Sequence, residues 1–253
     1  MMERTFLDNA LFLVMMMVLL NTTIPLVAGE QEKSSWRSCR TAADAACMFP
    51  GKIKVLLDNL DYKRDDLSAV KEAADQGDLG TAGEAVLAYY AEKKGDVFLM
   101  NPKGFRRVNA EHCMIDELKA SGIWARTPRL AHGGIDWEYK GPPGYNNNQW
   151  HQINRHQFMP NLYAAGVVSG EARYHDKLND YLLDWLVHAE ESRQLVRKTD
   201  RLLNAGIRLE TIWPKVFYSF QRSEHFRPAT RVLMLASLEE HGRFLRKYYN
   251  RKG

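Results

Sequence analysis

Three amide side chains in one stretch of the sequence are its first candidates for chemistry. The stretch is "QWHQINRHQFMPNLYAAG", residues 149–166, and at 100° per residue Asn154, Gln157 and Asn161 fall on the same side as its apolar residues. A buried amide without a partner costs on the order of 1–3 kcal/mol, so an inward-facing amide needs a polar neighbour. Either these amides bond neighbouring backbone, or this face of a helix lines a wet cleft.

The same stretch holds two histidines, but their spacing does not favour a metal. His151 and His156 are five residues apart, which separates them by roughly 140° around a helix. No CxxC or His-rich spacing typical of a zinc site occurs anywhere in the chain. The sequence therefore predicts neither a metal nor a cofactor.

Composition is that of a globular protein. With 253 residues, of which 45% are hydrophobic and 26% charged, the chain can bury a core and is neither mostly disordered nor an integral membrane bundle. The formal net charge of +4 favours an anionic partner only mildly, because Lys and Arg are scattered among Asp and Glu. A nucleic-acid partner is not predicted.

The N-terminus reads as a targeting segment. The uncharged apolar run "ALFLVMMMVLL" (10–20) has the length of a signal peptide, and Pro25 and the small residues at 27–29 follow it. We predict a signal peptide over 1–29, a secreted or periplasmic mature chain without stable membrane insertion, and a polar linker over 30–51. An uncleaved N-terminal anchor is the alternative.

Export makes the three cysteines relevant, because oxidising compartments permit disulfides. Cys39 and Cys47 lie close in sequence, so that a local bridge would leave Cys113 free. Three unpaired thiols are the equal alternative, since sequence spacing alone does not establish bridging geometry.

Beyond residue 51 the hydrophobic periodicity is helical, with no convincing strand. A helical hairpin is expected around Gly77 and Gly80, and a long Gly/Pro/Asn-rich section over 95–149 interrupts the pattern. Helices are expected again over 149–168, 171–191, 201–220 and 228–249. The fold class predicted is all-α, built from antiparallel helical hairpins.

Several segments resemble one known family. "GIDWEYKGPPGYNNNQWHQINRH", "SGEARYHDKLNDYLLDW", "LNAGIR" and "SLEEHGRFLRKYY" are similar, in this order, to the N-terminal helical domain of the heparinase II/III-like polysaccharide lyases, closest to the heparan-sulfate lyase branch. The likeness runs from about residue 52 to the end. It implies that 52–253 fold as an incomplete α/α toroid, which a β-sandwich follows in the family.

The sequence departs from the family in two places. The Trp-Arg pair that usually precedes "LNAGIR" is absent from "RKTDRLLNAGIR", and the chain reaches Gly253 before the segments that carry the family's catalytic Asn, Tyr and His. The expectation is therefore a truncated lyase that binds acidic polysaccharide weakly and cleaves it negligibly.

The resemblance also assigns site residues. A uronate lyase removes the C5 proton of the sugar after hydrogen-bond donors have neutralised the adjacent carboxylate, and then expels the group at C4. The residues implied are His156 for proton transfer, Asn154, Gln157 and Asn161 for sugar hydroxyls, Arg155 and Arg208 for carboxylate or sulfate, and Tyr145 and Trp150 for stacking. Structural roles remain open for Asn154 as a backbone cap, His156 as a core histidine and Trp150 as core.

Three functions follow. The first is the substrate-binding half of a secreted lyase that cleaves a uronic-acid-containing polysaccharide, heparan sulfate-like or alginate, by β-elimination. The second is a non-catalytic glycan-binding or assembly module. The third is an α/α-barrel glycoside hydrolase, for which Asp136 and Glu138 are the carboxylate pair to nominate, although they face opposite ways if extended.

Overall fold

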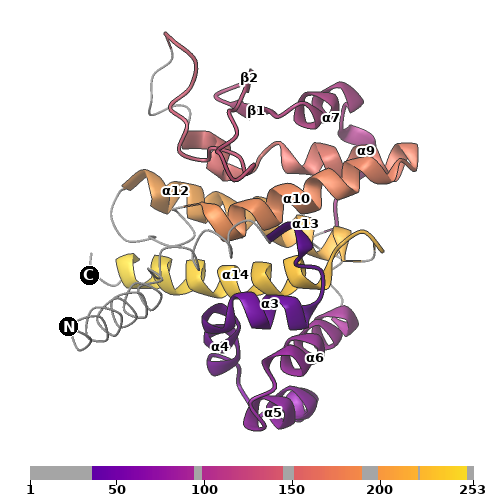
Figure 1. Cartoon of the computed structure of the whole chain (residues 1–253), viewed down its shortest axis with the longest axis vertical. Coiled ribbons are helices and arrows are strands. Elements are labelled where there is room, and N and C mark those ends of the chain that lie inside the picture. The colour runs from indigo at the N-terminus through magenta and orange to yellow at the C-terminus, as the bar shows by residue number, and fades with distance from the viewer. Residues whose placement is uncertain (1–35, 94–98, 145–150, 190–198, 222, 250–253) are drawn as a thin grey trace, which may run out of the picture. The chain divides into compact units, whose positions relative to one another are not determined.

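The computed structural model describes residues 36–93, 99–144, 151–189, 199–221 and 223–249 (Figure 1). The predicted signal peptide over 1–29 and the site candidates Tyr145 and Trp150 lie outside the described residues.

A first group of helices follows the short 3-10 turn η1 (Trp36–Ser38). It consists of α3 (Ala42–Met48), α4 (Pro50–Asp58), α5 (Ser68–Asp75) and α6 (Leu79–Glu92), with the 3-10 turn η2 (Asp65–Leu67) before α5. As predicted, α5 and α6 form a hairpin, and Gly77 turns the chain at a φ of +74°.

The described part of the predicted linker over 30–51 holds η1, α3 and the start of α4. Thr41 and Asp44 form a capping box that starts α3, and Ala42 and Ala45 of that helix are buried against α6. Small side chains make this packing close, since a Cβ on Gly80 of α6 would lie 3.2 Å from the backbone of Ala43.

The last helix, α14 (Pro228–Tyr249), lies between the first group and the rest of the described chain (Figure 1). It contacts α3, α4 and α6 on one side and α10 (Ala172–His188) on the other. Consecutive residues 232–236 of α14 are therefore buried all round, which is the pattern of a core helix rather than of a surface helix.

The predicted helix over 149–168 is interrupted. Residues His151–Arg155 form a 3-10 turn, η5, and α9 (Met159–Ser169) begins only after a break. His156 adopts a φ of +60° at the break, and Pro160 in the first turn of α9 has no N–H to continue the earlier ladder. Gly170, at a φ of +71°, then ends α9 and leads into α10.

The section over 95–149, predicted as loop, contains regular structure. It holds a 3-10 turn η4 (Pro102–Gly104), α7 (Arg107–Met114) packed on α9, and a hairpin of β1 (Glu117–Ala120) and β2 (Ile123–Arg126). The strands pair antiparallel around Ser121 and Gly122, both at positive φ, which suits a two-residue turn.

The chain from α12 (Thr199–Ile207) to α13 (Trp213–Phe220) passes through a π-helical turn, η6 (Arg208–Ile212). Among the described residues the hairpin β1–β2 is the one sheet, so the predicted all-α class is confirmed. No helix of the described chain is long and apolar enough to span a membrane.

The three cysteines are free thiols in the structure. Burial raises the pKa of Cys39 to about 12 and also raises the pKa of Cys113, whereas Cys47 is exposed. The structure therefore has three unpaired thiols and no bridge between Cys39 and Cys47.

The close packing of α3 on α6 predicts opposite effects for two glycines that occupy the second position of their helices. Gly51→Ala meets nothing within 4 Å, so we expect a neutral effect or a gain of up to about 1 kcal/mol from helix propensity. Gly80→Ala should instead destabilise by about 1–3 kcal/mol, because its Cβ presses on the Ala43 backbone. Urea unfolding of both variants tests this, and equal midpoints would contradict it.

Candidate functional site

A fully buried arginine lies where η5, η6, α10 and α14 meet. Arg208 donates from Nε and Nη2 to His241 Nε2 at 3.1 and 2.8 Å, and from Nη1 to the carbonyl oxygen of Asn154. Its Cζ also lies 4.5 Å from the ring centroid of Trp185 and 5.9 Å from that of Trp213. Hydrogen bonds and aromatic faces thus replace the water that this cation loses.

His241 is held as a neutral imidazole. Because Arg208 donates to Nε2, the ring proton is on Nδ1, from which it is donated to the carbonyl oxygen of Ser237. Burial, together with the positive charge of Arg208, keeps the pKa of His241 well below 6.5. This histidine therefore serves as an acceptor for the buried cation.

The side chain of Asn154 joins two segments. Its Nδ2 donates to the carbonyl oxygen of Trp137 at 3.1 Å, and its Oδ1 accepts the indole N–H of Trp185 at 2.8 Å. Both partners are fixed and the amide is buried. Asn154 therefore ties the loop that precedes η5 to helix α10.

His156 is enclosed by aromatic rings. The indole N–H of Trp213 donates to its Nδ1 at 2.9 Å, which places the ring proton on Nε2, and Nε2 has no partner among the described residues. Burial and the charge of Arg208 lower its pKa well below 6.5. We call Asn154, His156, Arg208 and His241, with Trp185 and Trp213, the buried cluster.

The structure thus brings together some of the predicted site residues and separates others. Asn154, His156 and Arg208 are in the buried cluster, and Arg155 lies beside it with Nε 3.0 Å from Asn204 Oδ1. Gln157 is exposed, and the buried Asn161 bonds Phe158 and Asn109 instead. The common amide face does not form because the helix breaks at His156, so the 100° periodicity does not continue through it.

An open pocket of about 360 Å³ lies between η1, the loop over 129–137 and α10. It is lined by Trp36, Arg37, Arg129, Gly133, Lys177, Asp180, Tyr181 and Asp184, and we call it the charged pocket. Trp137 links the charged pocket to the buried cluster, because its ring centroid lies 6.2 Å from that of Tyr181 and 5.7 Å from that of His156.

Asp116 anchors two of the cations of the charged pocket. Arg129 donates to both of its carboxylate oxygens at 2.6 and 2.8 Å, and Lys177 donates to one of them at 2.7 Å. Burial opposes the charge of Asp116, but these donors outweigh it and lower its pKa. Arg129 and Lys177 are therefore held in place while already partly neutralised.

Arg37 differs from these cations. It donates to the carbonyl oxygen of Gly133 at 2.7 Å and stacks on Trp36, but within the described ranges it makes no ion pair. A Cβ at Gly133 would lie 2.9 Å from its guanidinium, so glycine there permits the contact. Arg37 thus presents a charge that no carboxylate has neutralised in the described part of the chain.

Asp184 fixes the opposite wall of the charged pocket. Its carboxylate accepts the backbone N–H of Ile135 and faces His188 Nδ1, each at 2.7 Å. Gly134 makes room, because a Cβ there would lie 2.5 Å from the carboxylate. The loop that covers the pocket is therefore bound at two points, Ile135 to Asp184 and Trp137 to Asn154.

The sequence contained a signal for this pocket that was missed. Lys177, Asp180, Tyr181 and Asp184 recur at helical spacing along α10, within the helix expected over 171–191. The pocket has cations, carboxylates and aromatic rings, the groups that bind acid and hydroxyl functions. In the ranges that the structure covers, no three His, Cys, Asp or Glu side chains converge as metal ligands.

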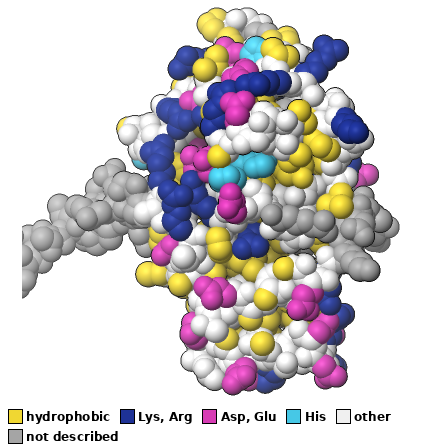
Figure 2. Space-filling model, turned by 90° about the vertical axis from the view of Figure 1, so that its right-hand side faces the viewer, with side chains coloured by type: hydrophobic (Ala, Val, Ile, Leu, Met, Phe, Trp, Pro, Cys, Tyr) yellow, Lys and Arg dark blue, Asp and Glu magenta, His cyan; other side chains and the backbone are white. Residues whose placement is uncertain are grey.

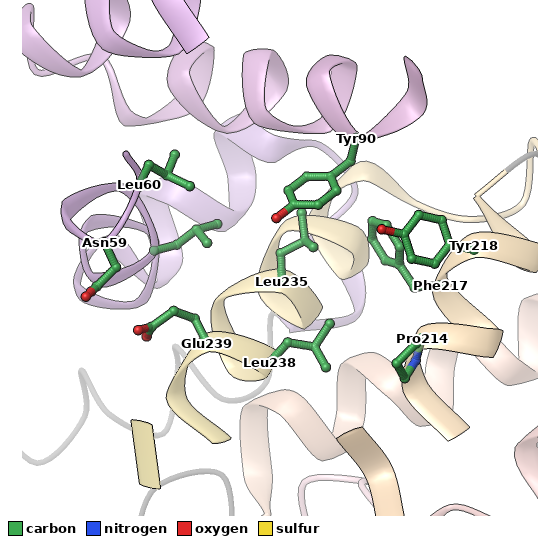
Figure 3. A pocket seen from close by; sticks show the side chains of 10 residues that line it. Asn59, Leu60, Tyr90, Pro214, Phe217, Tyr218, Leu235, Leu238 and Glu239 are labelled. Atoms are coloured by element: carbon green, nitrogen blue, oxygen red, sulfur yellow. The ribbon is translucent and has the colours of Figure 1, made fainter. Parts of the chain in front are cut away.

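Another cavity, of about 430 Å³ between α4, α6, α13 and α14, is a poorer candidate (Figure 3). Leu235, Leu238, Phe217 and other apolar side chains line most of it, and its one carboxylate, Glu239, pairs with Arg243 at 2.8 Å. This cavity offers little to an acidic ligand.

Solved structures share this fold. A heparan sulfate lyase from Pedobacter heparinus, HepC, superposes with a TM-score of 0.59 at 18% identity over 76% of this chain and 32% of that one. The heparinase III BT4657 gene product superposes with a TM-score of 0.57 at 18% identity over 77% of this chain and 32% of that one. The chain thus spans about a third of the length of these structures.

Residues 56–253 match the sequence model of the family described as heparinase II/III N-terminus. The chain belongs to this family. The predicted relationship to polysaccharide lyases is confirmed, and with it the fold of an incomplete α/α toroid. No curated protein matches the chain significantly.

The contacts of Asn154 predict a large effect of its removal. Asn154→Ala leaves the Trp185 N–H and the Trp137 carbonyl unpaired, so we expect a loss of about 2–3 kcal/mol in the free energy of unfolding. Asn59→Ala is the matched control, because Asn59 is exposed and bonds only its own helix. Chemical denaturation compares them, and similar losses in both variants would refute the linking role.

The two buried histidines predict a pH-dependent stability. Their folded pKa values lie well below 6.5, so the unfolded chain binds more protons once the pH falls below about 6.5. The contribution of these histidines to the free energy of unfolding should be fully present above that pH. On acidification the free energy of unfolding should fall by up to about 1.4 kcal/mol per pH unit for each histidine. Urea unfolding at a series of pH values measures the slope, and a flat profile down to about pH 5.5 would contradict the prediction.

Proposed function

We propose that this chain is the helical, substrate-binding part of a secreted or periplasmic polysaccharide lyase. Its substrate would be a uronic-acid-containing polysaccharide of the heparan sulfate type, cleaved by β-elimination in the complete enzyme. The observation that carries the proposal is the charged pocket, found in a chain of a lyase-related family. The two similar structures, a heparan sulfate lyase and a heparinase III, support the substrate class.

In this proposal the charged pocket binds one anionic sugar residue. Arg37 supplies the free charge for a carboxylate or sulfate, because guanidinium groups fork onto such anions. Asp180 and Asp184 can accept sugar hydroxyls, and Trp36 and Tyr181 supply apolar wall. Proton transfer is not assigned to His156, since its lone pair is engaged by Trp213 and its ring is enclosed.

One face of the molecule carries charges of both signs side by side (Figure 2). On the face that Figure 2 shows, Lys and Arg side chains run in a column beside Asp, Glu and His, without a uniformly basic area. Affinity should therefore depend on one pocket more than on net charge. The alternatives are a non-catalytic glycan-binding or assembly module and a lyase that acts on alginate, and binding data separate them.

Binding of defined polymers tests the proposal. We expect the chain to bind heparan sulfate oligosaccharides at low ionic strength, more weakly as salt is added, and not to bind neutral dextran. Arg37→Ala should weaken binding by about 10-fold or more, since it removes charge-assisted hydrogen bonds. Isothermal titration calorimetry gives both affinities.

Arg64→Ala is the charge-matched control, because Arg64 is exposed and pairs with Asp66 away from the pocket. Equal losses in both variants would show that only net charge matters. Tighter binding of alginate than of heparan sulfate would contradict the proposed substrate class and favour alginate. Unsaturated uronate detected by its ultraviolet absorbance would overturn the assignment of binding without proton transfer.

A further inference from the structure

A second polar cavity, of about 420 Å³, lies where the turn between α9 and α10 meets the segment between α13 and α14. His175 of α10, and Ser223, Glu224 and His225 of that segment, are among its lining residues. None of these residues belongs to the charged pocket or to the buried cluster. Their arrangement is independent of the proposed glycan binding.

The hydrogen bonds of His175 define which nitrogen is the base. Its Nε2 lies 3.1 Å from the carbonyl oxygen of Tyr163, and a carbonyl only accepts, so Nε2 carries the proton. Nδ1 therefore has a free electron pair, and Ser223 Oγ lies 3.3 Å from it. The hydroxyl donates to a neutral imidazole, which is the order of a nucleophile and its general base.

The imidazole is fixed in this orientation. Its ring stacks on Tyr163 with centroids 5.8 Å apart and packs 5.1 Å from Phe220. A Cβ at Gly166 would lie 2.4 Å from the ring, so only glycine permits the ring to sit there. Burial, with a smaller contribution from His225, lowers the pKa of His175 and keeps the base form at neutral pH.

The surroundings of Ser223 support a reactive oxygen. Its Oγ accepts the backbone N–H of His225 at 3.2 Å, which stabilises negative charge on that oxygen. The His225 ring lies 5.9 Å from the ring of His175 and within 4 Å of carboxylates of Asp176 and Glu224. His225 is therefore a second imidazole beside the pair.

We propose that Ser223 and His175 form a catalytic pair that hydrolyses small acyl esters. Ser223 Oγ bonds the ester carbonyl carbon while its proton passes to His175 Nδ1. The ester C–O bond then breaks and the leaving oxygen takes that proton, which releases the alcohol. Water attacks the acyl carbon, the bond to Ser223 breaks, and the carboxylic acid leaves as the serine proton is restored.

The acceptor behind His175 explains the choice of substrate class. It is a carbonyl oxygen and not a carboxylate, so it stabilises the imidazolium less than an aspartate would. Esters need less protonation of the leaving group than amides, which makes them the acyl compounds that this pair fits. The size of the cavity suits a short acyl chain.

Hydrolysis of p-nitrophenyl acetate by the full chain tests the proposal. We expect p-nitrophenolate release with acetyl transiently on Ser223, seen by mass spectrometry of the quenched reaction. Ser223→Ala should lose at least about 10-fold in rate, since positioned proton transfer alone contributes 10²–10⁴-fold in general. Ser68→Ala is the matched control, because Ser68 is exposed at the start of α5 and does not line this cavity.

A second variant separates chemistry from folding. Ser223→Cys keeps a nucleophile beside His175 and should form an acyl-thioester faster than Ser223→Ala reacts at all, with unchanged far-ultraviolet circular dichroism. Equal rates for the wild type and Ser223→Ala, acetyl found only on lysines, or no acylation of the cysteine variant would each overturn the proposal.

Discussion

The buried charge of Arg208 is the constraint on which the arrangement of the described chain depends. Moving a guanidinium out of water costs several kcal/mol unless fixed acceptors meet it. The acceptors come from η5, through the Asn154 carbonyl, and from α14, through His241, while α10 supplies the face of Trp185. Segments more than 30 residues apart in sequence must therefore be in register before this cation is satisfied.

The constraint extends from the core to the surface through a short series of contacts. The backbone of Asn154 meets Arg208, its side chain holds Trp137, and two residues earlier Ile135 is bound by Asp184 of the charged pocket. The loop over the pocket is thus held at Ile135 by Asp184 and at Trp137 by Asn154. The side chain of Asn154 thus helps to position the loop that covers the charged pocket, through its hydrogen bond to Trp137.

Local patterns predicted the long helices and failed where three-dimensional contacts decide. The apolar stripes of α6 and α10 identified them, because burial of one face requires that periodicity. The hairpin β1–β2 was not predicted, because strands of four residues are too short to show a clear alternation of apolar and polar residues. The break at His156 was not predicted either, because Pro160 is the one sequence feature that indicates it. The charged pocket could not be predicted as a whole because Trp36, Arg129 and Asp184 lie in three distant segments, and the spacing along α10 does not show which segments face it.

Hydrogen bonds fix the tautomers of two buried histidines, His156 and His241. A base that removes the C5 proton needs a free electron pair facing the sugar. In His156 and His241 the electron pairs accept hydrogen bonds from Trp213 and Arg208, and releasing either would leave a buried donor unpaired at a cost of about 1–3 kcal/mol. Both rings are therefore better suited to hold the fold than to accept a proton from a bound molecule.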